Sequence, residues 1–377
     1  MRKLILRIPI QSVFFIILIV SLYSCEKDTF ESCQLVEEIQ LDGMLDFESY
    51  DEFKQTASLL NNYTFQQLEQ WGEERNFISQ EYLFRKLIVE EEKYEQSIIE
   101  SFGSSVTEEF LKEESGLPQH SALYFELLSK GLISEITEKD GSTSYASTVI
   151  NPVYMSVINE AGFVRIEGKI FQFTNEGYKI INDGDPNKIK FLLEIDQTDI
   201  DAGITVVNMF SNKKGYGHSF DNYTLRYESN RKRTSFKSYF YAGSNGVYYE
   251  PASCMLSTFY LEGSAQKKNI WGNWVYKNNY TPITELSGTW SFQFKLVEYN
   301  NPYNYYYLNT ISNPDNNMSP LYYNFTQSVN NTSYFKFTCE PDGWFCASTG
   351  WLMDEINVYN YNFRMKAENY SDFVHTD

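Results

Sequence analysis

The chain has 377 residues, which is enough for one large domain or two ordinary ones. Apolar residues make up 42% and charged residues 21%, a composition typical of globular rather than disordered proteins. Acidic residues outnumber basic ones by 50 to 31, and the net charge of −19 argues against nucleic acid as a partner, because Lys and Arg must neutralise phosphates. With three His and five Cys, the sequence lacks a His-rich or Cys-rich metal array, and we expect no cofactor.

Residues 1–24 have the features of a signal peptide. Basic residues precede an apolar core of ten residues at 13–22, which is too short to span a membrane. The sequence Leu22-Tyr23-Ser24-Cys25 then resembles the lipobox of bacterial lipoproteins, in which the Cys is joined to diacylglycerol and becomes the acylated first residue. The resemblance implies that Cys25 is lipidated and that its acyl chains hold the protein at a lipid bilayer. The alternative is a plain signal peptide.

Residues 25–46 carry no clear periodicity and are predicted to form a tether. Its beginning, Glu26-Lys27-Asp28 followed by Glu31, resembles the acidic export signal of Bacteroidota surface lipoproteins. The resemblance implies an anchor in the outer membrane and exposure at the cell surface. The alternative is a charged, solvated linker without an export role.

The mature chain divides into two regions of different composition. Residues 26–150 hold 27 acidic and 9 basic residues, whereas residues 151–377 hold 23 and 19 together with 23 of the 30 Tyr. This change predicts a helical region at about 47–135 and a β-rich domain at about 145–377.

The helical region shows start and stop signals for four or five helices. Three capping boxes occur, at Ser49–Glu52, Thr64–Gln67 and Ser105–Glu108. A long amphipathic run begins at Ser79 and ends at Gly103, and Pro118 is predicted to lie in the first turn of a helix that ends at Gly131.

The second region alternates apolar and polar residues, as strands do. Residues 163–167, 169–173 and 178–181 predict a three-stranded meander. Seven further strands are predicted at 223–227, 234–241, 255–261, 271–276, 289–297, 321–325 and 334–338. We therefore expect an α+β protein, with a helical N-terminal region followed by a mainly antiparallel β-sandwich-like domain.

Residues 151–174 resemble a recurring stretch in uncharacterised Bacteroidota surface lipoproteins, a domain of unknown function. In that family a helical front half with a Trp-containing helix precedes an Asn-Glu-x-Gly element, two strands and a β-rich tail. Here Asn159-Glu160-Ala161-Gly162 and the segment around Glu69–Phe77 match. The family has no assigned activity, so the resemblance implies architecture and location alone.

The sequence shows no recognisable catalytic motif: Walker A, Gly-x-Gly-x-x-Gly, His-Glu-x-x-His and Gly-x-Ser-x-Gly are all absent. We therefore assign no catalytic residue. His120 is predicted at a helix start, and His375, near the C-terminus, is expected to fray. His218 lies in a Gly-rich loop beside Asp221, where binding residues often occur, although an ordinary exposed loop His is the alternative.

One weak calcium pattern is present, although we assign no metal site. Asp183, Asp185, Asn187 and Glu194 match positions one, three, five and twelve of an EF-hand loop. Position six, however, is Lys188 instead of Gly. The alternative is a polar turn.

Cys339 and Cys346 flank the turn sequence Pro341-Asp342-Gly343 and form a possible disulfide. A hairpin loop of two or four residues would place them opposite each other, within disulfide reach, and an exported protein can hold such a bond. A three-residue loop would place them on opposite faces.

A tyrosine-rich stretch provides the candidate ligand-binding residues. These are Tyr303, Tyr305, Tyr306, Tyr307, Tyr322 and Tyr323. Aromatic rings flanked by amides can stack on sugar faces and hydrogen-bond their hydroxyls. The alternative is ordinary packing in a Tyr-rich β-domain.

The sequence thus favours a membrane-anchored bacterial lipoprotein with a non-enzymatic binding or adhesion role, toward a glycan or a host-surface protein. One alternative is a glycoside hydrolase that uses two carboxylates and needs no His. Another is an accessory subunit of a surface complex, docked through the acidic helices.

Overall fold

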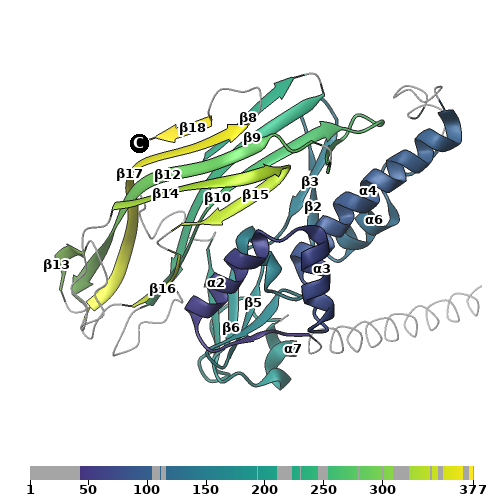
Figure 1. Ribbon diagram of the computed structural model, residues 1–377. Coiled ribbons are helices and arrows are strands. Elements are labelled where there is room, and N and C mark those ends of the chain that lie inside the picture. Colours follow the sequence, from purple (N-terminus) through teal and green to yellow (C-terminus); the bar gives the residue numbers. More distant parts are fainter. Residues whose placement is uncertain are drawn as a thin grey trace, which may run out of the picture.

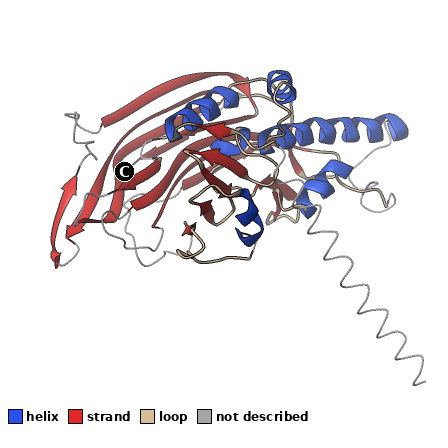
Figure 2. Ribbon diagram, turned by 90° about the horizontal axis from the view of Figure 1, so that it is seen from below, coloured by secondary structure: helices blue, strands red, loops and turns tan. Residues whose placement is uncertain are grey.

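The structure is a computed structural model. It describes residues 43–103, 111, 116–192, 194–209, 223–229, 231–244, 254–278, 280–298, 301–308, 322–339, 342–346, 351–367 and 373–376. The predicted α+β class is confirmed, because helices dominate the N-terminal region and antiparallel sheets the remainder (Figures 1 and 2). In the described part of the chain, no helix combines the length and the apolar character that crossing a membrane requires.

Four helices follow the predicted start signals. They are α2 (Tyr50–Asn61), α3 (Phe65–Glu73), α4 (Gln80–Phe102) and α6 (Ala122–Ser129). Thr64 and Gln67 form the predicted reciprocal capping box, and the Ser79 side chain caps α4. The helix predicted at Pro118 begins later, because Ser121 provides its N-cap. The predicted box at 105–108 lies outside the described residues.

A small sheet contacts both α2 and the β9 strand, and we call it the meander sheet. Its strand order is β1 (Asp46–Phe47), β4 (Phe163–Ile166), β5 (Lys169–Phe173), β6 (Gly177–Ile181) and β7 (Ile204–Asn208). The predicted three-stranded meander is therefore confirmed as β4–β5–β6. Shorter elements that the sequence did not predict are β2 (Ile133–Thr137), β3 (Thr143–Ser147), the 3₁₀ helices η2 (Pro152–Ser156) and η3 (Pro186–Lys188), and α7 (Ile189–Leu192).

Two larger sheets form the sandwich. The first sandwich sheet contains β8 (Tyr223–Ser229), β9 (Lys232–Ser244), β10 (Cys254–Lys268), β11 (Trp274–Tyr276), β15 (Tyr334–Thr338) and β16 (Gly343–Cys346). The second contains β12 (Ile283–Glu298), β13 (Asn301–Leu308), β14 (Tyr322–Thr332), β17 (Trp351–Ala367) and β18 (Phe373–Thr376). Every strand that the sequence predicted is present, most of them longer than expected.

The first sandwich sheet has two faces of different chemistry, which its alternating residues produce. Phe236, Phe240 and Phe259 are buried against the second sheet, where the Phe259 ring lies 6.0 Å from Trp290. Each fully buried apolar side chain of this kind stabilises the fold by about 1.5–3 kcal/mol. The intervening residues of β9 and β10 face the helices, and many of them are Tyr or charged.

The hairpin predicted at Pro341-Asp342-Gly343 is wrong. β15 and β16 both pair with β10, so they follow one another along one edge of it. The Cys339 N–H donates to the carbonyl of Phe259 (2.8 Å), whereas Cys346 lies opposite Cys254. The backbone register therefore does not place Cys339 opposite Cys346, as a disulfide between them requires.

Candidate functional site

A cavity of about 570 Å³ lies where α2, the meander sheet and β16 meet, and we call it the junction cavity. Its floor is the apolar face of the meander sheet, with Phe171 and Ile180. Tyr50 of α2 and Trp344 of β16 are aromatic residues of its walls. The volume falls within the range of about 300–1,000 Å³ that is usual for small-molecule sites.

Asp342 fixes the wall that carries Trp344. Its carboxylate is 2% exposed and accepts hydrogen bonds from the Phe259 N–H (3.2 Å), the Thr258 hydroxyl (3.3 Å) and the Asn151 amide (3.3 Å). The Tyr154 hydroxyl also donates to it. These donors come from β10 and the η2 segment, so one buried carboxylate joins the η2 segment to the first sandwich sheet. They also hold Asp342 at the edge of β10, directly before β16.

Burial, followed by the nearby Asp342 carboxylate, raises the pKa of Tyr154 well above its ordinary value. The phenol therefore stays protonated and donates its hydrogen to the carboxylate. Buried carboxylates need such donors, because an unpaired buried charge is costly.

Gly343 allows the close approach of the two aromatic walls. Its φ is +126°, in the region that favours glycine, and a Cβ atom there would lie 3.0 Å from the Tyr50 ring. A larger residue at this position would therefore push β16 away from α2.

The rim of the cavity is polar. Lys54 Nζ lies 3.6 Å from the Asp51 carboxylate and 3.5 Å from the Asp342 carbonyl oxygen. The Glu167 carboxylate accepts a bond from the Tyr50 N–H (3.4 Å). Asn182 and Thr205 contribute an amide and a hydroxyl. The site thus combines aromatic walls with hydrogen-bonding groups of both kinds.

The carboxylates of the site each have a partner. Asp51 and Asp342 face cationic or hydrogen-bond donors, and Glu167 accepts from a backbone N–H. Among the described carboxyl groups with a shifted pKa, all four have it lowered: Glu81, Glu138, Asp140 and Asp183.

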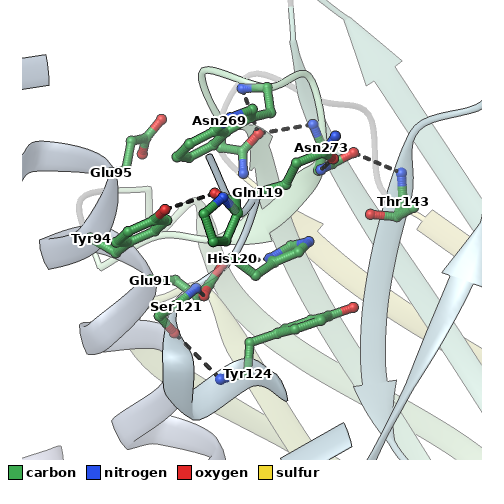
Figure 3. A network of polar contacts seen from close by, with 12 residues as sticks. Glu91, Tyr94, Glu95, Gln119, His120, Ser121, Tyr124, Thr143, Asn269 and Asn273 are labelled. Carbon is green, nitrogen blue, oxygen red and sulfur yellow. Dashed lines mark hydrogen bonds and ion pairs between the residues drawn. The ribbon is translucent and has the colours of Figure 1, made fainter. Parts of the chain in front are cut away.

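A polar network holds α4 against the first sandwich sheet (Figure 3). His120 is 5% exposed, its Nδ1 lies 2.7 Å from Glu91, and its ring stacks on Tyr124 at 3.8 Å. The Asn273 amide donates to Gln119 (2.9 Å) and accepts from the Thr143 N–H (3.0 Å). The network therefore fixes β3 and β11 relative to α4.

The other two histidines fall in different places. His375 does not fray: it is buried on β18, with Nδ1 2.7 Å from the Ser238 hydroxyl and its ring stacked on Tyr223. His218 lies outside the described residues.

The calcium pattern forms a polar turn. The Lys188 ammonium lies 2.5 Å from Asp183, where a cation would bind, and Asp185 caps η3 by accepting from the Asn187 N–H (3.0 Å). Glu194 is exposed beyond α7. In the described ranges, no three His, Cys, Asp or Glu side chains lie close enough to hold a metal ion.

The predicted tyrosine cluster lies on the second sandwich sheet. Tyr303 and Tyr305 on β13 are 91% and 52% exposed. The backbones of β13 and β14 follow each other along one edge of β12, with Tyr307 opposite Lys295 and Tyr322 opposite Ser291. The side chains of Tyr306, Tyr307, Tyr322 and Tyr323 lie outside the description, as does Cys25. The ligand-binding role of the tyrosines and the lipidation of Cys25 therefore remain predictions.

Sequence reasoning missed the junction cavity because its walls come from distant segments. Tyr50 follows the N-terminal residue of a capping box and Trp344 follows a turn sequence, and neither position by itself indicates a cavity. The one local signal was the Pro-Asp-Gly sequence, which we interpreted as a turn.

Comparisons with known proteins give little beyond this. Neither a family model nor a curated protein matches the chain. Among solved structures, the chain is similar to a DUF4848 family protein from Bacteroides thetaiotaomicron at 11% identity and a TM-score of 0.24, over 89% of this chain and 97% of that one.

Proposed function

We propose that the chain is a lipid-anchored bacterial surface protein that binds a glycan in the junction cavity without changing it chemically. The observation that carries this proposal is the pairing of aromatic walls, Tyr50 and Trp344, with a rim of amide, hydroxyl and charged groups. Sugars need both kinds of contact, because a pyranose has apolar faces and a hydroxylated edge.

Anchoring through Cys25 is compatible with binding at a distance from the bilayer. Seventeen residues lie between Cys25 and Gly43, the first described residue. At ~3.3–3.6 Å per residue, such a segment spans at most about 60 Å. The acyl chains would thus hold the protein at the outer membrane while its cavity faces the surroundings.

The hydrogen bonds and the ion pair that the carboxylates of the cavity already make favour binding over hydrolysis. Asp342 already accepts four hydrogen bonds, and Asp51 and Glu167 each have a donor. The hydrolase alternative needs one carboxyl group to give a proton to its substrate, whereas these carboxylates already accept hydrogen bonds or an ion pair from the protein.

The test uses the full chain solubilised in a detergent without a sugar headgroup. The solubilised chain is first applied to a glycan array. The glycan with the strongest signal is then titrated by calorimetry into the wild type, Trp344→Ala and Trp71→Ala. Trp71 is the matched control, because it is also half-buried but lies on α3, outside the cavity.

We expect Trp344→Ala to weaken binding at least tenfold and Trp71→Ala to change it less than threefold. The absence of any binding signal on the array, or equal affinity of both variants for the glycan, would refute the proposal. Release of new reducing ends from the bound glycan would favour the hydrolase instead.

A further inference from the structure

A second cavity, of about 200 Å³, lies on the face of the first sandwich sheet that is turned toward the helices. It shares no lining residue with the junction cavity. Its lining includes five tyrosines, and we call it the tyrosine cleft: Tyr239, Tyr241, Tyr260, Tyr276 and Tyr334.

The floor of the cleft is an aromatic platform that strand alternation creates. Tyr239 and Tyr241 are two residues apart on β9, and their rings are nearly parallel, with centroids 5.8 Å apart and planes at 13°. Tyr260 lies directly opposite Tyr239 on β10, with its ring 5.5 Å away. Three rings therefore lie side by side on one face of the sheet.

The walls of the cleft are held by packed rings and by the network of Figure 3. Phe84 of α4 is buried, and its ring lies 5.5 Å from Tyr276 and 5.8 Å from Tyr334. The Asn273 contact to Thr143 fixes β3 beside β11, the strand that carries Tyr276. The cleft is thus formed before any ligand arrives, which lowers the cost of binding.

Three buried tyrosine hydroxyls of the cleft are neutral at physiological pH. Burial raises the pKa of Tyr276 to about 12 and that of Tyr260 and Tyr334 well above the ordinary value. A neutral phenol both donates and accepts a hydrogen bond, as a sugar hydroxyl does.

Among the described residues that line the cleft, the charged ones are Lys237 and Glu262, and they neutralise each other. They lie opposite one another in the β9–β10 register, with Nζ and carboxylate 2.9 Å apart. Burial lowers the pKa of Lys237, but the Glu262 carboxylate outweighs it and raises the pKa overall. No lining charge is left to pair with a charged ligand.

We propose that the tyrosine cleft is a second binding site, and that it takes a single uncharged pyranose ring. One face of the ring stacks on the platform of Tyr239, Tyr241 and Tyr260, and its hydroxyls meet the phenols, the Asn175 amide and the Ser147 hydroxyl. The cleft lies below the size of about 300–1,000 Å³ that is usual for drug-sized ligands, so it has room for one ring.

The experiment titrates the full chain, in a detergent without a sugar headgroup, with methyl glycosides of glucose, galactose and mannose, and with methyl glucuronoside as the charged counterpart. Binding is followed by saturation-transfer-difference NMR. The variants are Tyr239→Ala, which removes the central ring of the platform, and Ser147→Phe, which fills the cleft and leaves the platform intact. Tyr227→Ala is the control, because Tyr227 is exposed on β8 outside the cleft.

We expect at least one neutral glycoside to bind at least tenfold more tightly than the glucuronoside. Tyr239→Ala and Ser147→Phe each lower that affinity at least tenfold, while Tyr227→Ala changes it less than twofold. Failure of all three neutral glycosides, equal binding of the glucuronoside, or undiminished binding by a folded Ser147→Phe chain overturns the inference. Trp344→Ala in the junction cavity leaves the titration unchanged, which separates this inference from the proposed function.

Discussion

Lys336 on β15 provides the sharpest test of how the helices are joined to the β-domain. Its ammonium bonds to the Glu81 carboxylate at the start of α4, and Arg85 Nε donates to the same carboxylate at 2.6 Å. Glu81 is fully buried, and the Lys336 side chain is 2% exposed. Replacement by Met in Lys336→Met keeps the stem of the side chain and removes its charge.

The contacts of Glu81 indicate how much stability Lys336→Met should lose. Burial by itself raises the pKa of Glu81, but Lys336 and Arg85 outweigh it and lower the pKa from 4.5 to about 2. At ~1.4 kcal/mol per pH unit, this fall corresponds to about 3 kcal/mol of stability. Removing one partner of a buried pair costs about 3–5 kcal/mol in other proteins. Since Arg85 remains in the variant, we expect Lys336→Met to lower the free energy of unfolding by about 3 kcal/mol at pH 7.

The expected pH dependence follows from the direction of the shift. A group with a lowered pKa stabilises the fold above its unfolded value of 4.5 and loses that contribution as the pH falls through about 2. The difference in stability between wild type and Lys336→Met should therefore be full at pH 7 and shrink between pH 4.5 and about 2.

Urea unfolding followed by circular dichroism measures these differences. Lys366→Met is the matched control: Lys366 pairs with Glu285 but is 49% exposed, so its loss should cost less than about 1 kcal/mol. The double variant Lys336→Met with Glu81→Leu should regain most of the loss, because it leaves no buried carboxylate, and Arg85, whose side chain is 20% exposed, keeps its hydrogen bonds to the Tyr63 and Asn61 carbonyls. A cost for Lys336→Met no larger than the control, or a double variant as unstable as the single one, would contradict this reasoning.

Three further predictions concern the cavity wall, a helix cap and the anchor. Asp342→Asn should lower the free energy of unfolding by about 2 kcal/mol, because hydrogen bonds to a charged group contribute ~1.5–3 kcal/mol, and a wild-type urea midpoint would contradict the role given to Asp342. Thr64→Ala should cost about 1 kcal/mol in the same assay through loss of the α3 cap, and an unchanged midpoint would show that the capping box contributes nothing. Intact mass spectrometry of the chain purified from membranes should show a first residue Cys25 with added acyl mass, whereas Cys25→Ala should lack it, and an unmodified thiol in the wild type would remove the anchor from the proposal.

The sequence contains enough information for the local elements. Ser49, Thr64 and Ser79 each accept a hydrogen bond from a backbone N–H of the first turn, and this chemistry needs only the next few residues. The strands likewise follow from alternation, because one face of each is apolar. Fold class and most helix and strand positions could therefore be predicted.

The candidate sites depend on which strands pair, and alternation does not contain that information. Tyr239 and Tyr260 are each recognisable as strand residues, but only the β9–β10 register places them opposite each other. Asp342 was predicted in a hairpin, because Pro-Asp-Gly is a turn sequence. It instead lies at the edge of β10, where the Phe259 N–H and other distant donors bind its carboxylate. The burial of His120 likewise depends on a contact with a distant segment, because its partner Glu91 lies on α4.

The most direct test of glycan binding in the junction cavity is a crystal structure of the full chain with the array-selected glycan bound. We predict the sugar between Tyr50 and Trp344, with its hydroxyls toward Asn182 and Thr205. Density for the glycan only on the exposed edge strand β13, beside Tyr303, would contradict that placement and return the binding role to the tyrosine-rich stretch.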